Sequence, residues 1–148
     1  MQTEESLSAS RGDHEKAEAE TGKRVLLVDD EPMILNAVKR LIKGVYPSSR
    51  IKPVSSVDDA IQTIGGGWIP DVILSDMTMP NKTGLDFYQW LRDNRSELVE
   101  RIYFISAGGL NRETTKFLDQ MQKEGRLIEK PWEMDVIRDR LQKILGEK

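Results

Sequence analysis

The 148-residue sequence contains no cysteine, a single histidine and few aromatic residues, which make up 6% of the chain. Without cysteine the chain can form neither disulfides nor thiolate metal sites, and a reducing compartment suits it. No apolar stretch approaches the roughly 20 residues that a membrane-spanning helix needs, and the N-terminus lacks the apolar core of a signal peptide. We therefore expect a soluble, cytoplasmic protein whose chain makes no membrane contact.

Charge is unevenly distributed along the chain. Residues 1–22 hold six acids, two bases and few large apolar side chains, whereas the remaining residues hold nineteen acids and twenty bases. A segment without apolar periodicity cannot bury a face. We expect residues 1–22 to form a disordered acidic leader or an interdomain linker, and residues 23–148 to form one domain. Neither part is basic enough to indicate direct nucleic-acid contact.

Short apolar runs alternate with stretches of helical spacing from Arg24 onward. The expected strands are Arg24–Val28, Arg50–Val54, Val72–Asp76, Ile102–Ile105 and Leu127–Ile128. The expected helices are Pro32–Val45, Val57–Ile64, Leu85–Asn94, Glu113–Lys123 and Val136–Leu145. This alternation predicts an α/β fold with a mainly parallel sheet. Pro53 has no N–H for a strand ladder, so its strand belongs at a sheet edge.

Four of the five expected strands end in side chains that can take part in chemistry. These side chains are Asp29 and Asp30, Asp76, Ser106, and Lys130. Because parallel strands end at the same edge of a sheet, the four groups can converge there. Crowded carboxylates need a cation, and Mg²⁺ prefers oxygen ligands. With Mg²⁺ bound, Asp76 could attack a phosphorus atom while Lys130 balances charge and Ser106 bonds a phosphoryl oxygen.

Each of these acids also has an ordinary structural role open to it. An aspartate at a strand end commonly forms a turn or caps a helix. That reading applies to Asp76 taken alone, and to Asp29 and Asp30 ahead of Pro32. The joint occurrence of the four groups, and no single member, favours a reactive site.

At these positions the sequence resembles the receiver domain of two-component response regulators, from Lys23 to about Leu145. The matching residues are Asp29-Asp30, Asp76 followed by Met79-Pro80 and Gly84, Ser106-Ala107, and Lys130-Pro131. The resemblance implies a flavodoxin-like, doubly wound sheet of five parallel strands in the order 2-1-3-4-5, flanked by five helices. In that order the strand containing Pro53 lies at an edge.

The resemblance also implies a function. A histidine kinase or a histidine phosphotransfer domain would supply the phosphoryl group, and Asp76 would accept it. Mg²⁺ would be held by Asp30, Asp76 and the Met77 carbonyl, with Asp29 helping through water. The bond before Pro131 would be cis, which only proline adopts at low cost. Such a chain is not an enzyme in its own right, but it assists its own phosphorylation and dephosphorylation.

One position departs from the family's pattern. Receivers usually carry an aromatic residue three positions before the lysine, where this sequence has Leu127, so the resemblance does not extend to the aromatic switch. Thr78 and Gly108 occupy positions that resemble those tuning the rate of phosphate loss in the family. A homodimer would use the face formed by the 113–123 helix, the 127–128 strand and the last helix.

Other readings stay open at this level. A haloacid-dehalogenase-like phosphohydrolase also uses an aspartate nucleophile with Mg²⁺, but its Asp-x-Asp motif is lacking at Asp76-Met77-Thr78. A pseudo-receiver binding module would keep the fold without phosphorylation. Only three residues follow Leu145, so we expect no output domain after it. The charged leader ending at Gly22-Lys23 resembles the linker before the C-terminal receiver of a hybrid histidine kinase, and a free-standing receiver is the alternative.

Overall fold

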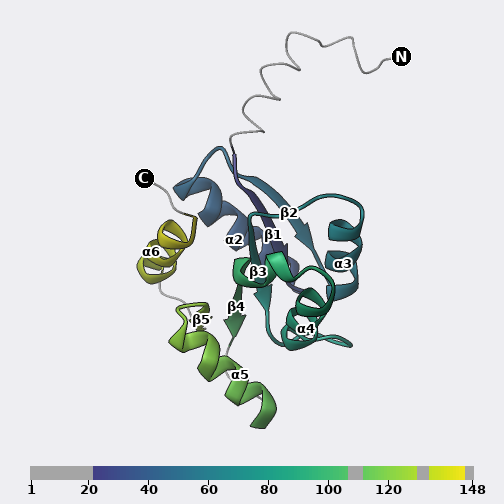
Figure 1. Cartoon of the computed structure of the whole chain (residues 1–148). Coiled ribbons are helices and arrows are strands. Elements are labelled where there is room, and N and C mark those ends of the chain that lie inside the picture. The colour runs from purple at the N-terminus through teal and green to yellow at the C-terminus, as the bar shows by residue number, and fades with distance from the viewer. Residues whose placement is uncertain (1–21, 107–111, 130–133, 146–148) are drawn as a thin grey trace, which may run out of the picture.

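The computed structural model describes residues 22–106, 112–129 and 134–145, along which strands and helices alternate (Figure 1). The strands are β1 (Arg24–Val28), β2 (Arg50–Val54), β3 (Val72–Asp76), β4 (Ile102–Ser106) and β5 (Leu127–Glu129). The helices are α2 (Pro32–Val45), α3 (Val57–Gly65), α4 (Gly84–Asn94), α5 (Arg112–Lys123) and α6 (Met134–Leu145), and a 3₁₀ helix, η1 (Ser96–Arg101), precedes β4. Within these ranges no helix combines the length and the apolar character needed to cross a bilayer.

The five strands are parallel and lie in the order β2-β1-β3-β4-β5, which confirms the predicted fold. β3 occupies the middle of the sheet, and all five of its residues are buried. β2 lies at one edge, where Pro53 is exposed opposite Leu27 of β1. The missing N–H of Pro53 is tolerated because no further strand needs it as a donor.

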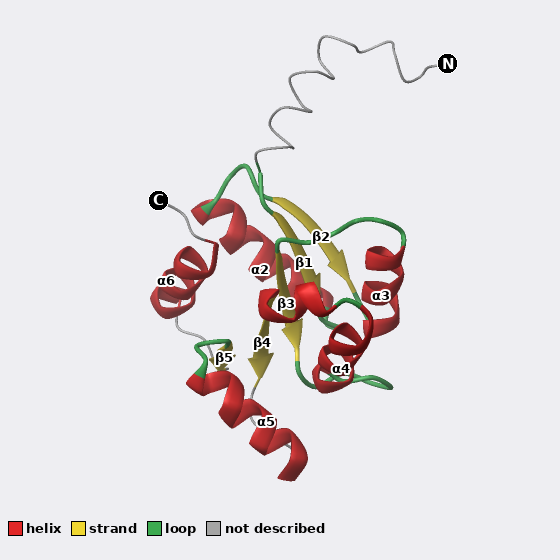
Figure 2. Cartoon of the chain, in the orientation of Figure 1, coloured by secondary structure: helices red, strands yellow, loops and turns green. Residues whose placement is uncertain are grey.

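Helices cover both faces of the sheet (Figure 2). α3, α4 and α5 pack on one face, and their core includes Leu26, Ile73 and Phe104 from alternate strand positions. α2 and α6 pack on the other face against strand residues such as Leu27 and Leu74. Successive strand side chains point to opposite faces, so strands covered on both sides read as unbroken apolar runs.

A capping box fixes the start of α4 beside the end of β3. The Thr83 hydroxyl accepts from the Asp86 N–H at 3.2 Å, and the Asp86 carboxylate accepts from the Thr83 N–H at 2.9 Å. Gly84 donates its N–H to the Met77 carbonyl at 2.9 Å, and a Cβ added to Gly84 would lie 2.9 Å from the Asp76 carbonyl oxygen. α4 begins at Gly84, one residue before the predicted start at Leu85. Only glycine fits at this position, because any Cβ would clash with the backbone of β3.

A buried arginine that the sequence pattern did not indicate ties η1 to the sheet. Arg126 is 8% exposed, and its guanidinium donates to the Ile102 carbonyl at 3.0 Å and to the Val99 carbonyl. It also lies 2.8 Å from a Glu124 carboxylate oxygen. Hydrogen bonds from Gln120 and then Arg126 hold the pKa of Glu124 below its usual value. This carboxylate therefore adds to stability above the usual glutamate pKa, and the contribution is lost as pH falls through the lowered pKa.

Candidate functional site

Three carboxylates meet at the edge of the sheet where β1 and β3 end. β1 and β3 are neighbours, with Val28 opposite Ser75, so the next residues, Asp29 and Asp76, lie side by side in the pairing direction. Asp30 follows directly. One carboxylate oxygen from each of the three acids lies within 4.8 Å of the other two. Parallel pairing thus brings together acids that are far apart in the sequence.

The acid cluster is buried on one side and open on the other. Asp29 and Asp76 are 3% and 6% exposed, whereas Asp30 is exposed to solvent. Carboxylates buried beside one another resist ionisation unless a positive charge compensates them. The grouped donors are all carboxylate oxygens, which suits a hard cation such as Mg²⁺. The described residues therefore fit an oxygen-coordinated divalent cation that enters from the side of Asp30.

Helix capping explains little of this cluster. Glu31 stands at the N-cap of α2 and makes no side-chain cap, and Pro32 opens the helix as the sequence indicated. One Asp29 oxygen accepts the Glu31 N–H at 2.9 Å. The Thr78 N–H lies 3.4 Å from an Asp76 oxygen, which is long for a hydrogen bond. Turn formation thus accounts for one oxygen of Asp29, and it does not explain why the other two acids lie next to it.

The peptide after Asp76 is held in place by α4. The Met77 carbonyl, predicted as a metal ligand, accepts the Gly84 N–H at 2.9 Å. A carbonyl oxygen has two lone pairs, so one remains for a cation. The Met77 side chain is 1% exposed in the core, whereas Thr78 faces solvent. The end of β3 is therefore anchored on one side and open at Thr78.

Ser106 ends the strand next to β3. Its predecessor Ile105 pairs with Asp76, so Ser106 lies one residue farther toward the sheet edge, and it is 1% exposed. Together with Leu127 of β5 and residues of α5, Ser106 lines a cavity of about 80 Å³. The remaining predicted site residues lie outside the described part of the chain, and their roles stay predictions: Ala107, Gly108, Lys130 and Pro131.

Comparison with known proteins identifies the family. The family model described as the response regulator receiver domain matches residues 25–142. The chain belongs to this family. As a receiver domain, it is a phosphoacceptor signalling module of two-component systems.

The curated relatives share only part of their length with this receiver domain. The nitrate/nitrite response regulator protein NarL of Escherichia coli (strain K12) is 33% identical over 69 residues, which are 47% of this chain and 32% of NarL. The chain thus spans about a third of the length of the curated relatives it matches. What lies beyond the receiver in those proteins says nothing about this chain.

Solved structures show the same fold. The chemotaxis response regulator CheY4 of Vibrio cholerae aligns with a TM-score of 0.65 and 22% identity, covering 84% of this chain and 100% of CheY4. The signal receiver domain of a signal transduction histidine kinase from Syntrophus aciditrophicus aligns with a TM-score of 0.63 and 20% identity, covering 84% and 91%. A chemotaxis regulator and the receiver domain of a histidine kinase thus align with this chain to a similar extent.

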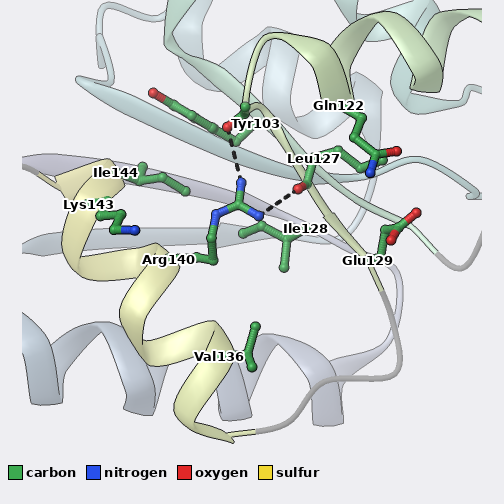
Figure 3. A pocket seen from close by; sticks show the side chains of 10 residues that line it. Tyr103, Gln122, Leu127, Ile128, Glu129, Val136, Arg140, Lys143 and Ile144 are labelled. Atoms are coloured by element: carbon green, nitrogen blue, oxygen red, sulfur yellow. Dashed lines mark hydrogen bonds between the residues drawn. The ribbon is translucent and has the colours of Figure 1, made fainter.

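A larger groove of this receiver domain lies away from the acids, between α5, β5 and α6 (Figure 3). Its volume is about 740 Å³. Arg140 of α6 donates across it to the carbonyls of Leu127, at 2.9 Å, and Gly125, at 3.1 Å. Because β5 is an edge strand, this guanidinium covers part of the open sheet edge. The groove lies on the face that the resemblance implies for a homodimer.

Proposed function

We propose that this receiver domain accepts a phosphoryl group on Asp76 from a phosphohistidine, with Mg²⁺ bound beside it. The observation that carries the proposal is the cluster of Asp29, Asp30 and Asp76 at the strand ends of a receiver-family chain. Asp76 ends the central strand, so the sheet and α4 hold its backbone in place. A fixed nucleophile beside a cation is what phosphoryl transfer requires, since catalysis there is mostly positioning and charge stabilisation.

In the proposed step, one carboxylate oxygen of Asp76 attacks the phosphorus atom. A P–O bond forms while the P–N bond of the phosphohistidine breaks, and its electron pair stays on the imidazole nitrogen. The product is an aspartyl phosphate, a mixed anhydride that water can hydrolyse. Ser106 would donate a hydrogen bond to one phosphoryl oxygen, and the Lys130 ammonium would form an ion pair with the phosphoryl group. Bound Mg²⁺ would offset the negative charge of the carboxylates and of the phosphoryl group.

Asp30 and Asp76 are proposed as direct metal ligands, together with the Met77 carbonyl, and Asp29 as a ligand through water. The exposure of Asp30 supports a direct role, because a hydrated cation reaches it first. One oxygen of Asp29 already accepts the Glu31 N–H, which fits a supporting role. The remaining lone pair of the Met77 carbonyl is compatible with a bond to the cation.

Acetyl phosphate should add a single phosphoryl group to the full chain, and it should do so only with Mg²⁺. This small donor needs no docking surface, so it tests the acid cluster alone. Without a cation, three carboxylates repel an anionic donor, and labelling should fall at least about tenfold, since a bound metal is worth several kcal/mol of charge stabilisation. Intact-mass spectrometry with Mg²⁺ or with EDTA measures the adduct.

Three outcomes would contradict this function. Absence of an adduct although Mg²⁺ binds would remove the phosphoacceptor role. Failure to bind Mg²⁺ would point to the pseudo-receiver alternative. Repeated turnover of p-nitrophenyl phosphate without an accumulating adduct would indicate the haloacid-dehalogenase-like alternative.

Replacing Lys130 with alanine should separate metal binding from signalling. The acids remain in Lys130→Ala, so Mg²⁺ binding, measured by isothermal titration calorimetry, should be retained, because the metal is bound through carboxylate and carbonyl oxygens and an ammonium is not a ligand. The phosphorylated variant should lose the conformational response, because the ammonium no longer pairs with the phosphoryl group. Amide hydrogen exchange before and after phosphorylation measures that response. Lys123→Ala, at an exposed lysine in α5, is the control and should behave like the unaltered chain.

The partners and context of the site are part of the proposal. We propose a histidine kinase or a histidine phosphotransfer domain as the donor, and a domain that assists its own phosphorylation and dephosphorylation without being an enzyme. Residues 1–22 would act as a linker or leader ahead of the receiver at 23–148, in the cytoplasm. The α5-β5-α6 face, with its groove, would serve homodimer formation (Figure 3). The receiver itself would contact no nucleic acid.

A further inference from the structure

Leu127 stands where receivers usually carry an aromatic residue, and the structure has a small void beside it that is open to solvent on one side. Leu127 is 6% exposed in β5 and lines the cavity of about 80 Å³ that Ser106 also lines. Thr115 and Leu118 of α5 also line it; Leu118 is buried and Thr115 is exposed at its solvent-open side. Tightly packed cores resist displacement, so an element moves most easily toward unfilled space. The void therefore gives α5 room to move toward the end of β4.

Three aromatic side chains join α5 to the rest of the domain on the same face of the sheet. The ring centroids of Phe104 in β4 and Phe117 in α5 are 5.3 Å apart in an edge-to-face arrangement. Phe117 also meets Tyr88 of α4 edge-on, with centroids 4.8 Å apart. Phe104 is fully buried, whereas Phe117 is only partly buried. The Phe117 ring thus links α5 to both β4 and α4.

This aromatic cluster reaches the backbone of the proposed acceptor. A Cβ added to Gly84 would lie 3.1 Å from a Phe104 ring carbon, 2.9 Å from the Asp76 carbonyl oxygen and 3.0 Å from the Met77 Cα. The Phe104 ring and the end of β3 therefore converge on the same point of α4. Because these atoms are closely packed, a shift of the Asp76 peptide toward α4 would have to displace either Gly84 or the Phe104 ring.

We infer that Phe117 of α5, and not a side chain at position 127, is the aromatic residue through which this domain responds to its phosphorylation. The inference rests on the proposed phosphorylation of Asp76. Phosphorylation adds negative charge at the end of β3. The element that changes conformation in response is α5, which moves into the void. As α5 moves, the Phe117 ring turns between Phe104 and Tyr88. Phe117 is a positioning residue, because it touches neither metal nor phosphate.

The chain offers a direct spectroscopic test, because it contains only three phenylalanines, Phe87, Phe104 and Phe117. Growth with 4-fluorophenylalanine gives three ¹⁹F resonances, assigned by single replacement with leucine. On phosphorylation by acetyl phosphate and Mg²⁺, the Phe117 resonance should shift most and that of Phe87 least. Intact mass measures phosphorylation separately, so failure to phosphorylate is distinguished from failure to respond. If the Phe117 resonance moves no more than that of Phe87 in the phosphorylated protein, the inference is wrong.

Variants at positions 117 and 127 test whether Phe117 couples the phosphorylation of Asp76 to α5. Phosphorylation should change amide exchange in α5 at least about fivefold, the lower end of typical coupling. Phe117→Leu should still be phosphorylated but lose this change, and Phe117→Tyr, which keeps the ring, should retain it. Leu127→Phe fills the void and should suppress the change. An unaltered response in Phe117→Leu, or a stronger one in Leu127→Phe, would overturn the inference.

Discussion

Asp76→Asn should abolish labelling by acetyl phosphate while leaving the domain folded. Asparagine matches aspartate in shape, but its amide is a poor nucleophile, so the phosphoryl adduct should fall by at least about 10³-fold, as when other nucleophiles are removed. The fold should survive, because the change removes one of three crowded negative charges and leaves an oxygen near the Thr78 N–H. Intact mass measures the adduct, and circular dichroism measures the fold.

Asp93→Asn is the matched control for this experiment. The Asp93 side chain is 67% exposed in α4, so its replacement by asparagine should change neither labelling nor stability. Labelling of Asp76→Asn at the level of the unaltered chain would show that another carboxylate is the acceptor. Asp30 would then be the next candidate, since it is the exposed member of the cluster.

The convergence of the acids could be predicted because it depends on strand order alone. Asp29 directly follows β1 and Asp76 is the last residue of β3. Because β1 and β3 are adjacent and parallel, the two residues reach the same sheet edge. The edge position of β2 was likewise predictable from Pro53, because a missing N–H excludes an interior strand. The alternation of strands and helices and the missing N–H of Pro53 could be read from local sequence patterns, whereas the strand order came from the resemblance to receiver domains.

The contacts around the site could not be predicted in the same way. Arg126 is buried because the Ile102 and Val99 carbonyls accept its hydrogen bonds, and these partners are more than twenty residues away. η1 has no apolar period of its own, so it depends on this contact and was missed. The meeting of Phe104 with Gly84 likewise arises from packing between distant segments. The spacing of apolar residues along the sequence does not indicate such contacts.

Family membership fixes the chemistry of this domain more firmly than its biological output. Membership in the receiver family accounts for an acidic pocket, and Asp29, Asp30 and Asp76 lie together at the strand ends of this chain. The curated relatives extend well beyond the matched region, since NarL is covered over only 32% of its length. Their outputs belong to those longer proteins, whereas the inferred response of α5 concerns the receiver domain itself.

Gly84→Ala should destabilise the domain, although alanine is normally the better helix residue. The new Cβ would stand 2.9 Å from the Asp76 carbonyl oxygen and 3.0 Å from the Met77 Cα, and neither backbone atom can rotate away. Overpacking of this kind lowers the free energy of unfolding by about 1–3 kcal/mol. Because the displaced atoms belong to the proposed acceptor and its neighbour, acetyl phosphate labelling should also slow on the order of tenfold. Urea unfolding and intact mass measure the two effects.

Gly44→Ala provides the opposite expectation within the same protein. A Cβ on Gly44, which is exposed in α2, would meet no atom within 4 Å. Alanine should therefore raise the free energy of unfolding by about 0.5–1 kcal/mol through its better helix propensity. Labelling should stay unchanged, because Gly44 lies near the C-terminal end of α2, far along the helix from the acids. If both variants unfold at the same urea concentration, the close approach at Gly84 does not constrain β3, and Phe104 cannot sense Asp76 through it.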